Sequence, residues 1–225
     1  MPVQDPSTFK PGSSPIGSWK RTLGRIFLGG GGNDPLYTVG PNGEPLFAEG
    51  MGRTQALYDN LLTGNVDDVT IDHNFEAGWG YQLIGEGIIP RTDSTVLMLR
   101  VKVSGTVISA NYAYGFRRQL IGLNSNDPGS TSDAEIQVNG DILMGTGTGE
   151  HCNFIIDIFS PASAGLPTDF QIHASGLSAN PFYFFSVGSG FYTVAAAING
   201  LYLVTDGATP GFSAGRFTLR RTRNT

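Results

Sequence analysis

Apolar and polar residues alternate with a period of two along most of the chain beyond residue 65, which is typical of β-strands. The clearest strand is predicted at 94–103, where Leu97 and Leu99 point one way and Arg100 and Lys102 the other. Gly, Asn and Pro separate the runs, and no helical pattern lies between them. Residues 65–225 are therefore predicted to form an all-β, antiparallel β-sandwich. The other predicted strands are 69–75, 81–89, 106–122, 134–144, 153–159, 170–174, 182–187, 191–198, 201–204 and 216–221.

Two of these segments have features of their own. The run 106–122 is long enough to bend and to contribute to two sheets. The run 134–144 is predicted to be a hairpin or a bulged strand, because Asn139-Gly140 is a strong turn dipeptide.

A different pattern precedes the sandwich. Turn residues dominate 33–52, with room only for a short hairpin whose strands are 37–39 and 46–48. In 53–62 apolar residues recur at Ala56, Leu57, Leu61 and Leu62, which predicts one short amphipathic helix ended by Gly64. Residues 33–64 are thus interpreted as a turn-rich linker.

The first 32 residues have the composition of an extended arm. The first 50 residues hold 10 of the 32 glycines and 7 of the 13 prolines, so this stretch cannot bury enough apolar surface to offset its ordering entropy. Isolated apolar residues can each fill a pocket on a partner, and prolines reduce the entropy lost on docking. Lys and Arg in the arm indicate an acidic partner surface. The proposed anchors are Phe9, Ile16, Trp19, Leu23 and Phe27.

Charge and cysteine content exclude several functions. The formal net charge is −5 and only 15% of residues are charged, so the chain has no overall electrostatic attraction to nucleic acid or to anionic lipid. No run of about 18 apolar residues occurs, and the N-terminus lacks the apolar stretch of a secretory signal. We expect a protein assembled in the cytoplasm. Cys152 is the single cysteine and is interpreted as a buried, inert thiol.

No motif indicates catalysis or a cofactor. The glycine run 145–149 lacks the Gly-Lys-Ser/Thr ending of a phosphate loop and leads into a strand. His73 lies between Asp72 and Glu76, where a solvated strand face is favoured over a metal site. No pair of carboxylates is marked out for glycoside cleavage. The chain is therefore expected to have no catalytic residue, no metal site and no cofactor.

The aromatic run 182–185, followed by Phe191 and Tyr192, stands out in composition. One interpretation is two core strands joined by a turn at 188–190, with Phe182, Phe184 and Phe191 inward. The other is an aromatic surface offered to a neighbouring subunit or to a glycan. Because both faces of the run are apolar, we expect a subunit interface made by Tyr183, Phe185 and Tyr192.

The region from about 65 to 221 resembles the small jelly-roll domains of structural proteins in tailed bacteriophages. The resemblance rests on 113–116 (Ala-Tyr-Gly-Phe), on 153–158 followed by Ser160-Pro161, and on the closing run 212–220. In that group the last strand often follows a turn of a small residue and Gly. The resemblance implies a virion protein, commonly a trimer, with the jelly roll outward and the N-terminal arm docked on the particle.

These observations predict a non-enzymatic virion component of a tailed phage, in a tail fibre or other tail-associated appendage. The expected partners are other virion proteins of the tail or capsid, in a homotrimer, with no nucleic acid and no membrane. One alternative is a capsid decoration protein that stabilises the head. Another is an adhesin that binds or depolymerises a host-surface glycan.

Overall fold

The computed structural model describes residues 38–39, 45–46, 54–121, 123 and 125–223. The chain divides into two compact units, 1–51 and 52–225. In the first unit, β1 (Thr38–Val39) and β2 (Pro45–Leu46) form an antiparallel pair at the place where the hairpin was predicted. The second unit holds all the other strands, and the described part of the chain contains no helix.

The larger sheet of the second unit has nine strands. Eight of them lie side by side, and β9 (Ser125–Asn126) pairs with β8. In spatial order the eight are β10 (Gly129–Asp133), β8 (Tyr112–Leu120), β14 (Tyr183–Tyr192), β13 (Thr168–Leu177), β12 (His151–Phe159), β5 (Trp79–Pro90), β16 (Phe212–Arg223) and β3 (Gln55–Leu62).

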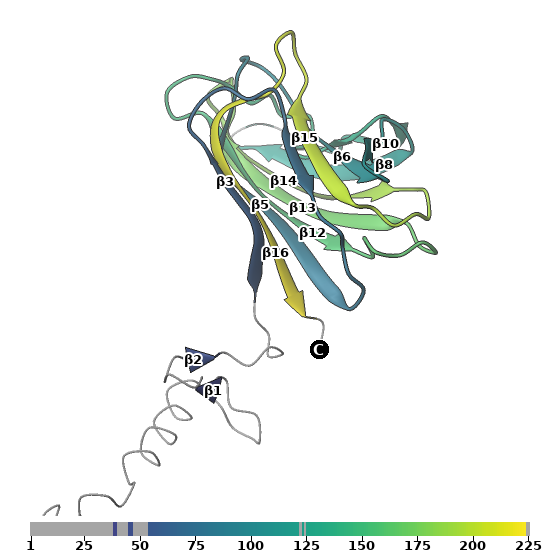
Figure 1. Cartoon of the computed structure of the whole chain (residues 1–225). Coiled ribbons are helices and arrows are strands. Elements are labelled where there is room, and N and C mark those ends of the chain that lie inside the picture. The colour runs from purple at the N-terminus through teal and green to yellow at the C-terminus, as the bar shows by residue number, and fades with distance from the viewer. Residues whose placement is uncertain (1–37, 40–44, 47–53, 122, 124, 224–225) are drawn as a thin grey trace, which may run out of the picture. The chain divides into compact units, whose positions relative to one another are not determined.

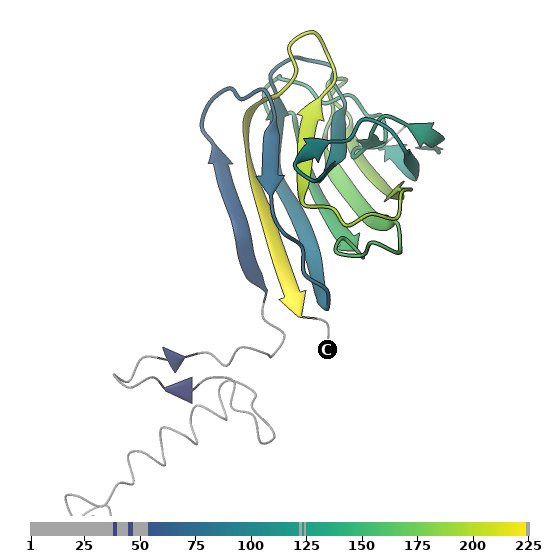
Figure 2. The same cartoon turned by 45° about the vertical axis from the view of Figure 1, so that its right-hand side comes forward.

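The smaller sheet has five strands. Its order is β11 (Ile136–Gln137), β6 (Leu97–Val103), β15 (Gly200–Thr205) and β4 (Val69–Asp72), and β7 (Thr106–Val107) pairs with β6. It lies against one side of the larger sheet, while β3, β5 and β16 extend past its end (Figures 1 and 2).

One apolar core lies between the two sheets. The inner residues of the larger sheet, such as Leu83, Phe154 and Ile172, pack with those of the smaller sheet, such as Leu99 and Leu203. All strand pairs are antiparallel, and the chain passes repeatedly from one sheet to the other. The predicted all-β fold, with antiparallel sheets in a sandwich-like arrangement, is confirmed.

The segment 106–122 contributes to both sheets, as its length predicted. β7 pairs with β6 in the smaller sheet, and β8 pairs with β14 in the larger one. The turn at Asn139-Gly140 is also present: Gly140 has a φ of +62°, and the buried Asn139 Oδ1 accepts a hydrogen bond from Leu97 N at 3.0 Å.

The predicted helix at 53–62 is wrong, because this segment forms the edge strand β3. It pairs with β16, with Asp59 opposite Thr218 and Leu61 opposite Arg216. Leu57 has no partner in this register, so a bulge shifts the period of two and leaves apolar residues at helix-like spacing. The sandwich therefore begins by Gln55, inside the expected 33–64 linker.

The aromatic segment is one strand, not two. β14 runs through Gly188, Ser189 and Gly190, where a turn was expected. A Cβ on Gly188 would lie 2.3 Å from the carbonyl oxygen of Gly115, and one on Gly190 would lie 2.7 Å from Ile136. These glycines allow close packing of neighbouring residues instead of chain reversal.

The closing strand also differs from the expectation. The resemblance implies a turn of a small residue and Gly before the last strand, which Ala214-Gly215 could form, but Gly215 lies inside β16, at a register shift and with a φ of +131°. A bulge at this point bends the strand without ending it.

Candidate functional site

The candidate site lies on the outer face of the larger sheet, the side away from the smaller sheet. Along β12, β13 and β14 buried and exposed residues alternate. Phe154, Ala174 and Ser186 point into the core, so their neighbours Ile155 and His173 point outward.

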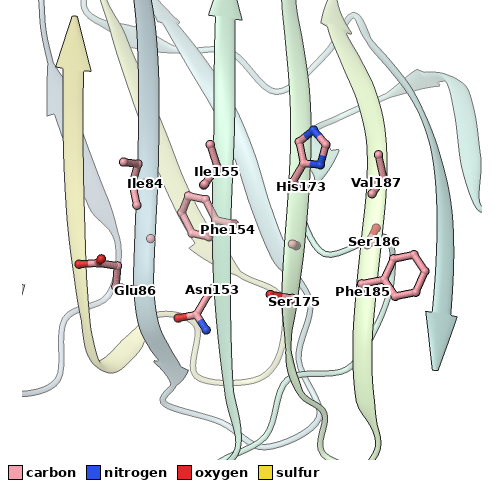
Figure 3. Close-up of a pocket in the computed structure, with 12 residues that line it drawn as sticks. Ile84, Glu86, Asn153, Phe154, Ile155, His173, Ser175, Phe185, Ser186 and Val187 are labelled. Atoms are coloured by element: carbon pink, nitrogen blue, oxygen red, sulfur yellow. The ribbon is translucent and has the colours of Figure 1, made fainter. Parts of the chain in front are cut away.

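Strand register places eight outward residues in two rows across β5, β12, β13 and β14. The first row is apolar apart from its histidine, with Ile84 opposite Ile155, Ile155 opposite His173, and His173 opposite Val187. The second row is mostly polar, and Figure 3 shows it beside the first. It consists of Glu86, Asn153, Ser175 and Phe185.

The two rows line an open groove of about 490 Å³. Its floor is formed by the strands and by parts of inward residues, among them Gly85 and Phe154. A Cβ on Gly85 would lie 2.2 Å from the Phe154 ring, so only glycine fits above that ring. The volume lies within the range of about 300–1,000 Å³ that is common for ligand pockets.

The polar side chains of the groove have free hydrogen-bonding capacity. Asn153 Oδ1 accepts a hydrogen bond from Gly87 N at 2.7 Å, which fixes the amide and leaves its NH₂ group for other partners. Glu86, His173 and Ser175 have no side-chain hydrogen bond or ion pair within residues 54–121 and 125–223. Among the described residues, no Lys or Arg lines the groove.

The guanidinium opposite Glu86 in the register belongs to Arg216, which already has a partner. Arg216 Nε donates to Asp59 Oδ1 at 2.7 Å, and Nη2 donates to Asp59 Oδ2 at 2.5 Å. Hydrogen bonding to Arg216 lowers the pKa of Asp59 below its ordinary value, and the same contact raises the pKa of Arg216. Arg216 therefore forms its ion pair with Asp59, and the Glu86 carboxylate lines the groove without an ion pair among the described residues.

A second outer feature, which we call the Tyr183 corner, lies at the end of the sheet beside Phe185. It consists of Ile121, Leu123, Phe182 and Tyr183, all of them exposed apolar residues. Ile121 N donates to Tyr183 O at 2.8 Å, which joins the ends of the two segments.

The structure separates the three residues expected at a subunit interface. Tyr183 and Phe185 point outward, with 64% and 41% of their surface exposed. Tyr192 does not: it is 4% exposed, and its ring lies 5.6 Å from that of Tyr112 in the core. The expected interface role of Tyr192 is wrong, because the unbroken β14 gives positions 183 and 192 opposite directions.

The same register reverses the expectation for Phe191. Phe184 is buried, as expected, but Phe191 faces outward with 38% of its surface exposed. Phe182, also expected inward, is exposed to the same extent, 38%. The arm residues Phe9, Ile16, Trp19, Leu23 and Phe27 lie outside the described residues.

Potentially reactive groups elsewhere are held in unreactive environments. Cys152 is fully buried, and burial raises the pKa of its thiol to about 12. His73 packs against Phe75 and Tyr81, with ring centroids 5.1 and 5.6 Å away. Burial and the nearby Arg221 lower the pKa of His73 below its ordinary value.

The described residues contain no group of three or more His, Cys, Asp or Glu side chains placed to hold a metal ion. A search of the same residues for a helix long and apolar enough to cross a membrane finds none.

Comparison with protein-family models gives no match, and comparison with curated proteins gives none either. Among solved structures, a chain from a structure of infectious bursal disease virus, Gt strain, aligns at 14% identity with a TM-score of 0.12. The alignment covers 86% of this chain and 46% of that chain, so this chain spans less than half the length of the viral one. At this TM-score the likeness gives no information about fold or function.

Sequence reasoning missed the groove. Its residues come from four strands between positions 84 and 187, and only the register brings them together. The one signal in the sequence was the outward alternation of 153–159 and 170–174, which marks the faces of single strands but not their neighbours.

Proposed function

We propose that this protein is a non-enzymatic structural component of a tailed-phage virion. In this proposal the N-terminal arm docks on other virion proteins, and the sandwich packs against further copies of itself. The observation that supports it most is β14: Phe184 and Tyr192 fill the core on its inner side, while Tyr183 and Phe185 are exposed on its outer side. When a strand is apolar on both faces, the core covers only its inner face, so a further molecule must cover the outer one.

The proposed cover is another copy of the chain in a homotrimer, in contact at the Tyr183 corner. A closed cyclic assembly buries such an apolar patch on every copy. An open chain of copies would leave one patch exposed at its end. Phe185 lies between the Tyr183 corner and the rest of the groove.

We further propose that the two sheets are a variant of the jelly roll. The repeated passage of the chain between the sheets and the exclusively antiparallel pairing support this, since a jelly roll is a double-sheet, antiparallel architecture.

A tail fibre or tail-associated appendage is the preferred location, and a capsid decoration protein is the alternative. Purified particles from the host that produces this protein would be analysed by quantitative gel densitometry. A handful of copies per particle supports the tail, hundreds support the head, and absence of the chain from particles would refute the proposal.

The arm is tested in the same particles. Deletion of residues 1–51 should abolish incorporation, because the sandwich alone lacks the docking segment. Trp19→Ala should weaken incorporation more than Phe9→Ala does, since aromatic anchors at interfaces commonly contribute about 2 kcal/mol or more and Trp offers the larger contact. Normal incorporation of the deletion would contradict docking through the arm.

A further inference from the structure

We propose that the outer groove on β5, β12, β13 and β14 is a binding site for a neutral oligosaccharide. The ligand class follows from three properties of the groove: its exposed aromatic ring, its free polar side chains and the absence of Lys and Arg from its lining in the described part of the chain. The inference shares Phe185 with the proposed subunit contact but none of the other groove residues, so it requires that contact to leave the Phe185 ring accessible.

The groove offers a sugar both kinds of contact that a pyranose ring needs. One face of a pyranose is a sheet of C–H groups, and the half-exposed ring of Phe185 is a matching apolar platform. The hydroxyl groups at its edge both donate and accept hydrogen bonds. Glu86 accepts and the Asn153 amide donates, while Ser175 in the same row and His173 in the first row add further hydrogen-bonding groups.

The structure disfavours an extended peptide. Peptides that add to a sheet need a free strand edge. The four strands that line the groove are all central, and each is paired on both sides. A ligand must therefore be held by side chains, which suits a molecule with hydroxyl groups all around its edge.

A second protein copy and an anionic ligand are also disfavoured. A covering protein would take Glu86 and His173 out of water, and within residues 54–121 and 125–223 neither has a partner to compensate. An anion would meet the carboxylate of Glu86, and none of the described Lys and Arg residues lines the groove to balance it. A neutral, polyhydroxylated ligand has neither problem.

The probes are neutral trisaccharides of glucose, galactose, mannose and N-acetylglucosamine, added to the full-length protein. Saturation-transfer NMR would detect binding, and calorimetric titration would measure the affinity of each trisaccharide that binds. We expect at least one trisaccharide to bind.

Phe185→Ala should weaken that binding about tenfold or more, which corresponds to about 1.4 kcal/mol. Phe185→Tyr keeps the ring and should retain binding. Asn153→Ala and Glu86→Ala should also weaken it.

Phe159→Ala is the matched control, because Phe159 is a similarly exposed aromatic residue on the outer side of β12 but does not line the groove. Thermal unfolding of each variant would show that the fold is kept. Tyr183→Asp should leave sugar binding intact while changing the oligomer, so failure of one proposal does not imply failure of the other. The site is refuted if no trisaccharide binds, or if Phe159→Ala weakens binding as much as Phe185→Ala.

Discussion

The hydroxyl group of Tyr112 accepts a hydrogen bond from Val101 N at 2.8 Å and so joins the two sheets of the sandwich. The same hydroxyl donates to Ile108 O at 2.9 Å. Tyr112 is fully buried at the start of β8, where the chain has just left the smaller sheet, and burial raises the pKa of its phenol well above the ordinary value. These two hydrogen bonds hold in place the segment between β7 and β8, in which the chain crosses from the smaller sheet to the larger one.

Tyr112→Phe should lower the free energy of unfolding by about 1–3 kcal/mol, because it leaves a buried N–H and a partly buried C=O without this partner. Urea titration of the purified protein measures the change. Tyr114→Phe is the control, since Tyr114 is less buried and its hydroxyl makes a single 3.3 Å contact with Asp133. An equal loss in both variants would contradict a special role for the Tyr112 hydroxyl.

Gly188→Ala should destabilise the sandwich by about 1–3 kcal/mol, since overpacking of a well-filled interior has that effect. The added Cβ would lie 2.3 Å from a main-chain oxygen, that of Gly115, so β8 and β14 must move apart. Gly115→Ala is the control on the neighbouring strand, because a Cβ there meets nothing within 4 Å. Scanning calorimetry should show a lower melting temperature for Gly188→Ala than for Gly115→Ala, and the reverse order would contradict the packing.

Asp169→Asn should stabilise the protein at neutral pH. The carboxylate oxygen Oδ1 of Asp169 is buried without a hydrogen-bond partner in the described structure, and burial raises the pKa of this carboxyl above 3.8. At a pH between 3.8 and the raised pKa, the folded state therefore holds a proton that the unfolded state has released. The stability of the protein falls as the pH rises through this range.

Removal of that charge should raise the stability at pH 7 by less than about 1 kcal/mol, because the carboxyl is only partly buried and water screens its charge; the melting temperature should rise by at most about 2–4 °C. The gain should disappear well below pH 3.8, where both states are protonated. Asp157→Asn is the control, because Asp157 Oδ1 already accepts a hydrogen bond from Gln82 Nε2 at 2.8 Å. A gain for Asp169→Asn that persists at low pH would contradict the explanation.

Two N-terminal deletions should differ in stability. Deletion of residues 1–51 removes the first unit and should leave the unfolding of the sandwich unchanged. Deletion of residues 1–64 also removes β3, which exposes one edge of β16 and breaks the pair between Arg216 and Asp59. Circular dichroism during heating should show a lower melting temperature for the longer deletion alone; equal melting temperatures would contradict the place of β3 in the sheet.

The sequence was sufficient for the fold class and for most strands, because alternation reports directly on a half-buried strand. The common face of Leu97 and Leu99 was predicted correctly for this reason. The hydrophobic pattern led to a wrong prediction at β3, because the bulge at Leu57 disturbs the period of two. The strand is determined there by its pairing with β16.

The prediction for the segment that forms β14 was wrong for another reason. Its glycines were interpreted as a turn, although Gly188 and Gly190 are required by the close approach of Gly115 and Ile136. Without that turn, Tyr192 lies inward and Phe191 outward. The groove could not be predicted, because no local pattern specifies which strand lies beside β13.

The oligomeric state tests the central claim most directly. Multi-angle light scattering of the full-length protein at micromolar concentration should give three times the mass of one chain. Tyr183→Asp should give a single chain with an unchanged melting temperature, because Tyr183 is 64% exposed and contributes little to the core. Phe159→Asp, on the outer face but away from the Tyr183 corner, should remain trimeric. A wild-type protein that is monomeric under these conditions, or a trimer that Tyr183→Asp leaves intact, would contradict the proposed assembly.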